Sequence, residues 1–202
     1  RAKLALGCLL CAAMVALAGC AKRPDVQRGG FRVGLITPGS VTDAAWNSGA
    51  FAGLTAIHDS LGAAVSSVEA RTPAEQEDAL RTYASEGYDL ILAHGYEFQA
   101  AAERVSAEYP GPVFVVTSGE RAAGRVVPLV FRLEDASYLA GMVAGGLTKS
   151  GIIAFVGGVE LPPVKRAYEG WVNGARAVNP GVRTRASYLN NWDDPAAGRE
   201  AA

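Results

Sequence analysis

The sequence predicts an α/β fold of two doubly wound lobes, each with a parallel sheet between helices. Seven apolar, β-rich runs alternate with helical patterns along residues 31–202, and this alternation is typical of parallel sheets covered on both faces. Residues 134–147 are apolar nearly all round and rich in small residues, which predicts a buried helix where the chain enters the second lobe. Only two strand runs follow it. Because two strands make a poor sheet, we expect the second lobe to be truncated.

The predicted strands are short runs rich in β-branched and aromatic residues. They cover residues 31–37, 64–68, 89–93, 113–117, 126–131, 152–156 and 183–189.

The predicted helices lie between these runs. In the first, apolar residues from Trp46 to Leu61 recur at three- and four-residue steps, and Gly62 suits its end. The second opens with the capping box Thr72-Pro73-Ala74-Glu75 and ends near Gly87. Further helical patterns cover residues 98–109 and 164–178, and Asp194-Pro195 opens a last helix.

The N-terminal residues 1–19 have the pattern of a secretory signal. Two cations, Arg1 and Lys3, precede an apolar run that ends in Leu17-Ala18-Gly19-Cys20. The run is shorter than the roughly 20 residues of a bilayer span and lacks the polar face of a core helix. Its last four residues resemble a bacterial lipobox, in which the signal is cut before a cysteine that is then lipidated. We therefore expect a chain anchored by Cys20 to the extracytoplasmic side of the cell membrane, with residues 20–30 as a tether.

Charge and cysteine content narrow the function further. Without the two cations of the signal, 17 basic and 20 acidic side chains remain, a net charge of −3. Lys and Arg do not cluster, which excludes a nucleic-acid partner. Cys8 and Cys11 lie in the signal and Cys20 is the lipid site, so the folded part should hold no disulfide and no cysteine metal site. We expect no metal and no cofactor.

Five segments in order resemble the basic membrane protein family of ABC-transporter substrate-binding lipoproteins, which includes purine-nucleoside receptors. The resemblance implies a type I periplasmic-binding-protein fold, with ligand held between hinged lobes. From the position of the small-residue helix we expect an N-terminal lobe at 31–132 and a partial C-terminal lobe at 133–202. It also implies delivery of a small solute to an ABC permease, and we expect the protein to be a monomer. The segments are VGLITPGSVTDAAWNSGAFAGL, GYDLILAHGYEF, FRLEDASYLAGMVAG, GIIAFVGGVELPPVKRAYEGWVNGARAVNPGV and NNWDDPAAGREAA.

The first candidate site residues follow the first strand. Ligands of open parallel sheets sit beyond the carboxyl ends of the strands, where Asp43, Trp46 and Asn47 share one helical turn. An aromatic ring beside a carboxylate and an amide suits a flat, hydrogen-bonding ligand, and a helix start adds free N–H donors. Alternatively, Asp43 only complements the helix dipole and Trp46 begins the core stripe.

Other candidates follow later strands. Tyr96 is expected to contact the ligand, whereas His94 is either a ligand donor or a structural hydrogen-bonding group. Ser118 stands where, by resemblance, nucleoside-binding members carry an Asp that holds the ribose. A hydroxyl cannot replace a carboxylate as a double acceptor, which favours a free purine base or another small, flat, polar solute over a nucleoside. Gly158 permits close backbone approach, which fits the wall of a binding cleft but also any tight turn. By resemblance Trp192 is the second aromatic of a base sandwich, the alternative being an interface aromatic.

The sequence therefore predicts a solute-binding lipoprotein of an ABC importer for a purine base or nucleoside. A ligand-sensing surface lipoprotein not coupled to transport is the alternative. An enzyme is not expected, because no G-x-G-x-x-G follows a strand and no P-loop is present. The export signal also excludes a fold-related transcription regulator.

Overall fold

The computed structural model describes residues 30–43 and 45–202. The predicted signal, residues 20–29 of the tether and the lipidation site Cys20 lie outside the described residues. The chain divides into residues 1–30 and residues 31–202, and the second unit is described below. Within the part that the structure describes, no helix combines the length and the apolar character that a membrane span requires.

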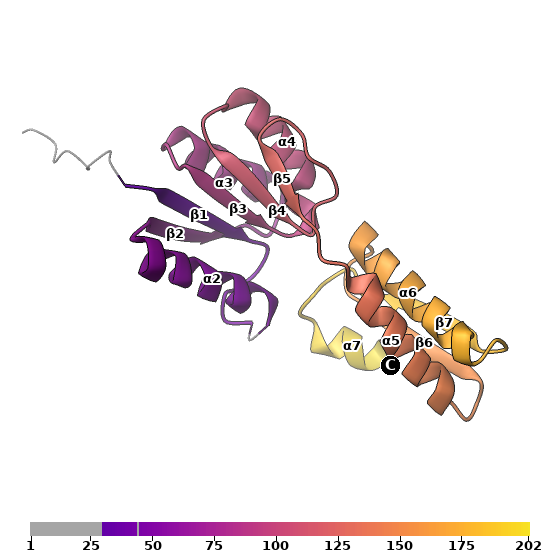
Figure 1. The fold of residues 1–202 in the computed structure, drawn as a ribbon. Coiled ribbons are helices and arrows are strands. Elements are labelled where there is room, and N and C mark those ends of the chain that lie inside the picture. Colours follow the sequence, from indigo (N-terminus) through magenta and orange to yellow (C-terminus); the bar gives the residue numbers. More distant parts are fainter. Residues whose placement is uncertain (1–29, 44) are drawn as a thin grey trace, which may run out of the picture. The chain divides into compact units, whose positions relative to one another are not determined.

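The first sheet has five parallel strands in the order β2-β1-β3-β4-β5 (Figure 1). This confirms the α/β prediction, and the strands agree with the predicted runs to within two residues at each end. Their bounds are β1 (Arg32–Thr37), β2 (Ala64–Glu69), β3 (Leu90–His94), β4 (Val113–Thr117) and β5 (Val126–Leu129).

Helices cover the first sheet unequally. On one face, residues of α3 and α4 pack over Ile36, Ile91 and Phe114 in the larger core. On the other, Leu54 of α2 packs on Val33 and Leu35 of β1. The helical segments are α2 (Trp46–Leu61), α3 (Pro73–Ser85), the 3₁₀ turn η1 (Tyr96–Phe98) and α4 (Gln99–Glu108).

Two predicted helix signals are confirmed. Gly62 ends α2 with a left-handed φ of 63°. At the start of α3, the Thr72 hydroxyl accepts a hydrogen bond from the Glu75 N–H at 3.3 Å, and the Glu75 carboxylate accepts one from the Thr72 N–H at 2.9 Å. Both pairs satisfy N–H groups that a helix start leaves without partners.

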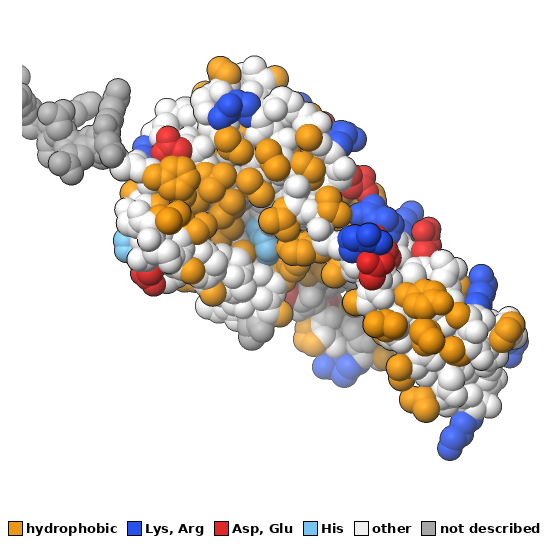
Figure 2. All heavy atoms as spheres, in the orientation of Figure 1, with side chains coloured by type: hydrophobic (Ala, Val, Ile, Leu, Met, Phe, Trp, Pro, Cys, Tyr) orange, Lys and Arg blue, Asp and Glu red, His pale blue; other side chains and the backbone are white. Residues whose placement is uncertain are grey.

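Helices cover both faces of this sheet, as expected, but the cover is incomplete over β5. Val127 and Leu129 of β5 are 49% and 43% exposed, because α2 packs over β1 and β2 and leaves the β5 side open. Figure 2 shows hydrophobic side chains gathered on the visible face over this sheet.

The C-terminal part has a two-stranded parallel sheet beside two packed helices. Strands β6 (Ile152–Gly157) and β7 (Arg183–Tyr188) pair in parallel. Helices α5 (Leu133–Leu147) and α6 (Pro162–Val178) pack together, and α7 (Pro195–Ala201) ends the chain. The small core contains Ile153, Trp171, Val172, Ala175 and Val182. The lobe boundaries at 132 and 133 stay predictions.

The prediction that the helix at 134–147 is buried is wrong. Leu139, Val143 and Leu147 of α5 are 64%, 60% and 75% exposed, and its buried residues are Gly141 and Gly145. Only one face of α5 packs against α6. The small residues of α5 therefore permit a close helix crossing, as expected, but do not produce full burial.

Candidate functional site

Asp43 binds the first turn of α2. Its Oδ1 accepts hydrogen bonds from the N–H groups of Ala45 (3.1 Å) and Ser48 (2.9 Å), and its Oδ2 accepts one from the Asn47 N–H (2.8 Å). These bonds hold the pKa of Asp43 well below its usual range, and those from the Asn47 and Ser48 N–H groups have the largest effect. The helix-start donors that we expected to serve a ligand are thus largely taken by Asp43. Ligand contact by Asp43 stays a prediction.

Asn47 lies beside this carboxylate and is 8% exposed. Its Nδ2 donates to Asp43 Oδ2 at 3.0 Å. Its Oδ1 is buried without a hydrogen-bond partner among the described residues, an arrangement that costs free energy. The amide therefore serves first to hold the α2 start, and its contact with a ligand stays a prediction.

Trp46, the first residue of α2, lies outside the buried core clusters. Its ring stacks on His94 with centroids 4.3 Å apart and planes 26° apart, and it meets Phe131 edge-on at 5.7 Å. The side chain is among the exposed large hydrophobics, at 39%. Trp46 therefore offers an aromatic surface at the carboxyl edge of the sheet, whereas Leu54 supplies the core contact of α2.

His94 ends β3 and is 6% exposed. Its Nε2 lies 3.1 Å from the Trp46 carbonyl, and its Nδ1 lies 3.0 Å from the Thr117 hydroxyl. Burial is the main cause that lowers the pKa of His94, so its imidazole is neutral at pH 7. Of the two roles left open for His94, this geometry fits the structural one.

Tyr96 and Ser118 lie at the same edge. The Tyr96 hydroxyl donates to Glu120 at 3.5 Å. Ser118 follows β4, is 8% exposed, and has a left-handed φ of 57°. Its N–H donates to the Leu129 carbonyl at 2.8 Å. A non-glycine residue with this backbone conformation is uncommon and clusters at functional sites.

Three further residues of this edge are absent from the sequence-based prediction. Phe131 contacts Trp46, and Thr117 contacts His94. Glu97 lies in η1 between Tyr96 and the buried Phe98, and burial raises the pKa of its carboxyl group. Of these three residues, only Glu97 has a signal in the sequence, as an acidic residue within an apolar turn. The other two contacts depend on sheet order and on the chain path after β5.

The second group of candidates lies at the end of β6 and after β7. The six-membered ring of Trp192 covers Gly158 so closely that a Cβ there would lie 3.0 Å from Trp192 Cδ2, with two further ring atoms nearer still. Trp192 is 57% exposed. Asp194 accepts hydrogen bonds from the N–H groups of Ala196 (2.8 Å) and Ala197 (3.0 Å) and so caps α7, as predicted. The structure thus brings Gly158 and Trp192 together.

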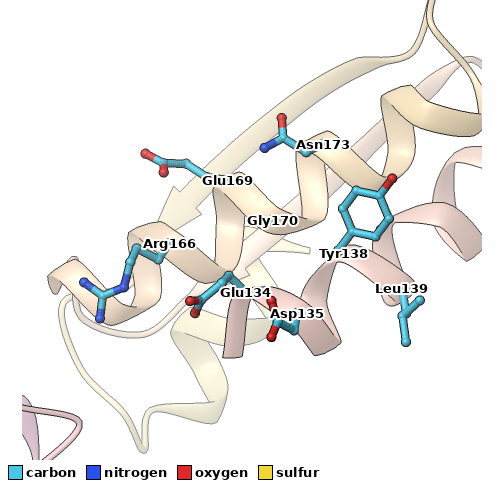
Figure 3. Close-up of a pocket in the computed structure, with 8 residues that line it drawn as sticks. All are labelled: Glu134, Asp135, Tyr138, Leu139, Arg166, Glu169, Gly170 and Asn173. Atoms are coloured by element: carbon cyan, nitrogen blue, oxygen red, sulfur yellow. The ribbon is translucent and has the colours of Figure 1, made fainter. Parts of the chain in front are cut away.

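An open groove of about 550 Å³ runs between α5 and α6 (Figure 3). Its charges are largely compensated, because Arg166 pairs with Glu120, while Glu134 and Asp135 pair with Arg132. None of the predicted site residues lines it, and we do not assign the ligand to it. The lining residues are Glu134, Asp135, Tyr138, Leu139, Arg166, Glu169, Gly170 and Asn173.

The fold defines a class, the α/β proteins of periplasmic-binding-protein type. The structure is similar to that of ABC transporter solute-binding proteins from Aeropyrum pernix K1, with a TM-score of 0.75 and 23% identity. That match covers 84% of this chain and 50% of the other. It shows the shared fold.

Residues 31–202 match the model of the PnrA-like ABC transporter substrate-binding proteins, and the chain belongs to this family. The family is one of solute-binding proteins rather than of enzymes. Membership confirms the resemblance seen in the sequence.

Three curated relatives illustrate the range of the family. A CD4+ T-cell-stimulating antigen of Listeria innocua is 30% identical, covering 96% of this chain and 58% of that protein. A putative ABC transporter glucose-binding protein of Haloferax volcanii is 31% identical, and the match covers 66% of this chain and 34% of that protein. A purine-binding protein of Brucella abortus is 26% identical, and the match covers 85% of this chain and 50% of that protein. The chain spans about half the length of the curated relatives it matches.

Proposed function

We propose that the protein is the extracytoplasmic solute receptor of an ABC importer and that it binds a purine base. The observation that carries this proposal is the exposed indole of Trp46 at the carboxyl edge of the first sheet. A flat heterocycle stacks well on such a surface, because base–aromatic stacking contributes about 1–3 kcal/mol per base. Trp192, 57% exposed over Gly158, supplies a second aromatic surface.

Polar groups at the same edge of the sheet as Trp46 would supply recognition of the base edge. Tyr96, Ser118 and Glu97 follow β3 and β4 at the same edge of the sheet, and they offer hydroxyl groups and a carboxylate. Purines present ring nitrogens and N–H groups around their edge, which hydroxyl and carboxylate groups can bind. A purine-binding relative, of Brucella abortus, is consistent with this ligand class.

Ser118 favours a base over a nucleoside. The family resemblance implies a carboxylate at this position in members that hold ribose, and here a single hydroxyl replaces it. A carboxylate can accept hydrogen bonds from both hydroxyls of a vicinal diol through its two oxygens, whereas a serine has a single hydroxyl oxygen. The ribose of a nucleoside would thus lose part of its binding energy.

The proposed setting follows from the N-terminal sequence. Lipidation of Cys20 would anchor the receptor to the outer side of the cell membrane, where an ABC permease receives the solute. Binding must favour a closed arrangement of the lobes over an open one, because a ligand shifts a conformational equilibrium only through differential affinity.

Calorimetry on the protein as its gene encodes it tests the proposal. We expect adenine or hypoxanthine to bind at micromolar affinity or better, adenosine to bind more weakly, and glucose to give no heat. Heat with glucose and none with any purine would overturn the ligand class. Uptake of radiolabelled adenine that persists after deletion of the gene would argue for sensing rather than transport.

A further inference from the structure

His94 joins three elements at the carboxyl edge of the first sheet. It is the last residue of β3, it contacts Trp46 at the start of α2, and it pairs in register with Thr117 at the end of β4. At 6% exposed it is almost completely buried. Its neighbours in the protein therefore determine which ring nitrogen donates and which accepts a hydrogen bond.

The contacts of His94 define its tautomer. The Trp46 carbonyl only accepts hydrogen bonds, so the His94 Nε2–H donates to it at 3.1 Å. The neutral ring then carries a lone pair on Nδ1, which accepts the Thr117 hydroxyl hydrogen at 3.0 Å. Both ring nitrogens are satisfied by the protein itself. No N–H of His94 remains for a ligand.

The ring faces of His94 and Trp46 complete the arrangement. Their centroids lie 4.3 Å apart with planes at 26°, so the imidazole covers one face of the indole. The edge contact with Phe131, at 5.7 Å and 74°, limits sideways movement of the same indole. An aromatic ligand can therefore stack only on the face of Trp46 that His94 does not cover.

We propose that His94 is a positioning residue that holds the Trp46 indole in the orientation that receives the ligand, without contacting the ligand itself. This inference rests on the proposed function. The imidazole stacks on one face of Trp46, and the hydrogen bond from the Thr117 hydroxyl holds the imidazole in place. A side chain held by packing and hydrogen bonds loses less conformational freedom when the ligand binds.

A double-mutant cycle with adenine separates positioning from direct contact. We expect His94→Ala to weaken adenine binding about three- to tenfold, in line with the worth of an aromatic pair. In a Trp46→Ala background the same change should have almost no further effect, since His94 acts through Trp46. His58→Gln is the matched control, because His58 of α2 also contacts a backbone carbonyl, that of Ala63 at 2.8 Å. It should leave adenine affinity unchanged.

Fluorine NMR of protein labelled with 5-fluorotryptophan reports on Trp46 without any ligand. His94→Ala and His94→Gln should both shift and broaden the Trp46 resonance, while His94→Phe, which keeps a ring beneath the indole, should restore a sharp line. His58→Gln should not move it. A resonance unchanged in His94→Ala, or a loss of adenine affinity that persists in the Trp46→Ala background, would overturn the inference. If the wild-type protein binds no purine, the proposed function fails while the NMR result still decides whether His94 positions Trp46.

Discussion

The backbone of Tyr138 in α5 lies directly against Gly174 in α6. A Cβ placed on Gly174 would lie 2.7 Å from the Tyr138 carbonyl carbon and closer still to its oxygen, a separation that real atoms do not show. Gly170 meets Glu134 in the same way, while Gly141 and Gly145 of α5 meet Trp171 and Ala175 of α6. Glycines on both helices thus set the distance between α5 and α6. This crossing explains why a helix rich in small residues need not be buried all round.

The crossing predicts that Gly174→Ala destabilises the chain by about 2 kcal/mol or more, because overpacking against a rigid backbone forces the helices apart. Urea denaturation followed by circular dichroism measures the free energy of unfolding. Gly146→Ala in α5 is the matched control, since a Cβ there meets nothing within 4 Å. It should be neutral or slightly stabilising, because alanine has a higher helix propensity than glycine. Equal effects of the two changes would contradict the role assigned to the crossing.

Asp43 predicts a pH-dependent contribution to stability. Its hydrogen bonds from Asn47 and Ser48 lower its pKa in the folded chain below the value of about 3.9 in an unfolded one. Protons therefore bind the unfolded chain more tightly, and the contribution is present above about pH 4 and lost as the pH falls below it. We expect Asp43→Asn to lower the melting temperature at pH 7 and to lower it less at pH 3. A difference between the two proteins that grows toward low pH would contradict this account.

Replacing Ser118 with aspartate should let the protein recognise ribose. Aspartate tolerates the left-handed backbone that Ser118 adopts at φ 57°, and its carboxylate accepts two hydrogen bonds. We expect Ser118→Asp to raise the affinity for adenosine relative to adenine by about tenfold, in line with hydrogen bonds to a charged group. Calorimetry with both ligands gives this ratio. Ser118→Asn, of similar size but without the charge, is the control and should change the ratio much less.

Much of the fold could be predicted because its signals are local. The Thr72–Glu75 capping box and Gly62 mark helix ends through contacts between near neighbours in sequence. The apolar runs gave the strands, because parallel strands in a covered sheet are apolar on both faces. Burial of α5 was predicted wrongly, since composition does not reveal how many neighbours a helix has.

The candidate site was less predictable for a physical reason. Trp46 and His94 are 48 positions apart and meet only because α2 begins beside the end of β3. His94 and Thr117 meet through the register of β3 with β4. Strand order and register decide such contacts, and residue spacing along the chain does not encode them. The sequence could therefore name Trp46 as a candidate but not show what supports it.

Adenine titrations into Trp46→Ala and Phe51→Ala show whether the exposed face of Trp46 receives a purine. Phe51 is the matched control, because it lies on the same helix and is 40% exposed, close to the 39% of Trp46. Trp46→Ala should weaken adenine binding at least tenfold, as expected for loss of a base–aromatic stack, while Phe51→Ala should leave it unchanged. Adenine affinity that survives Trp46→Ala, or that falls equally in both variants, would show that the purine does not stack on Trp46.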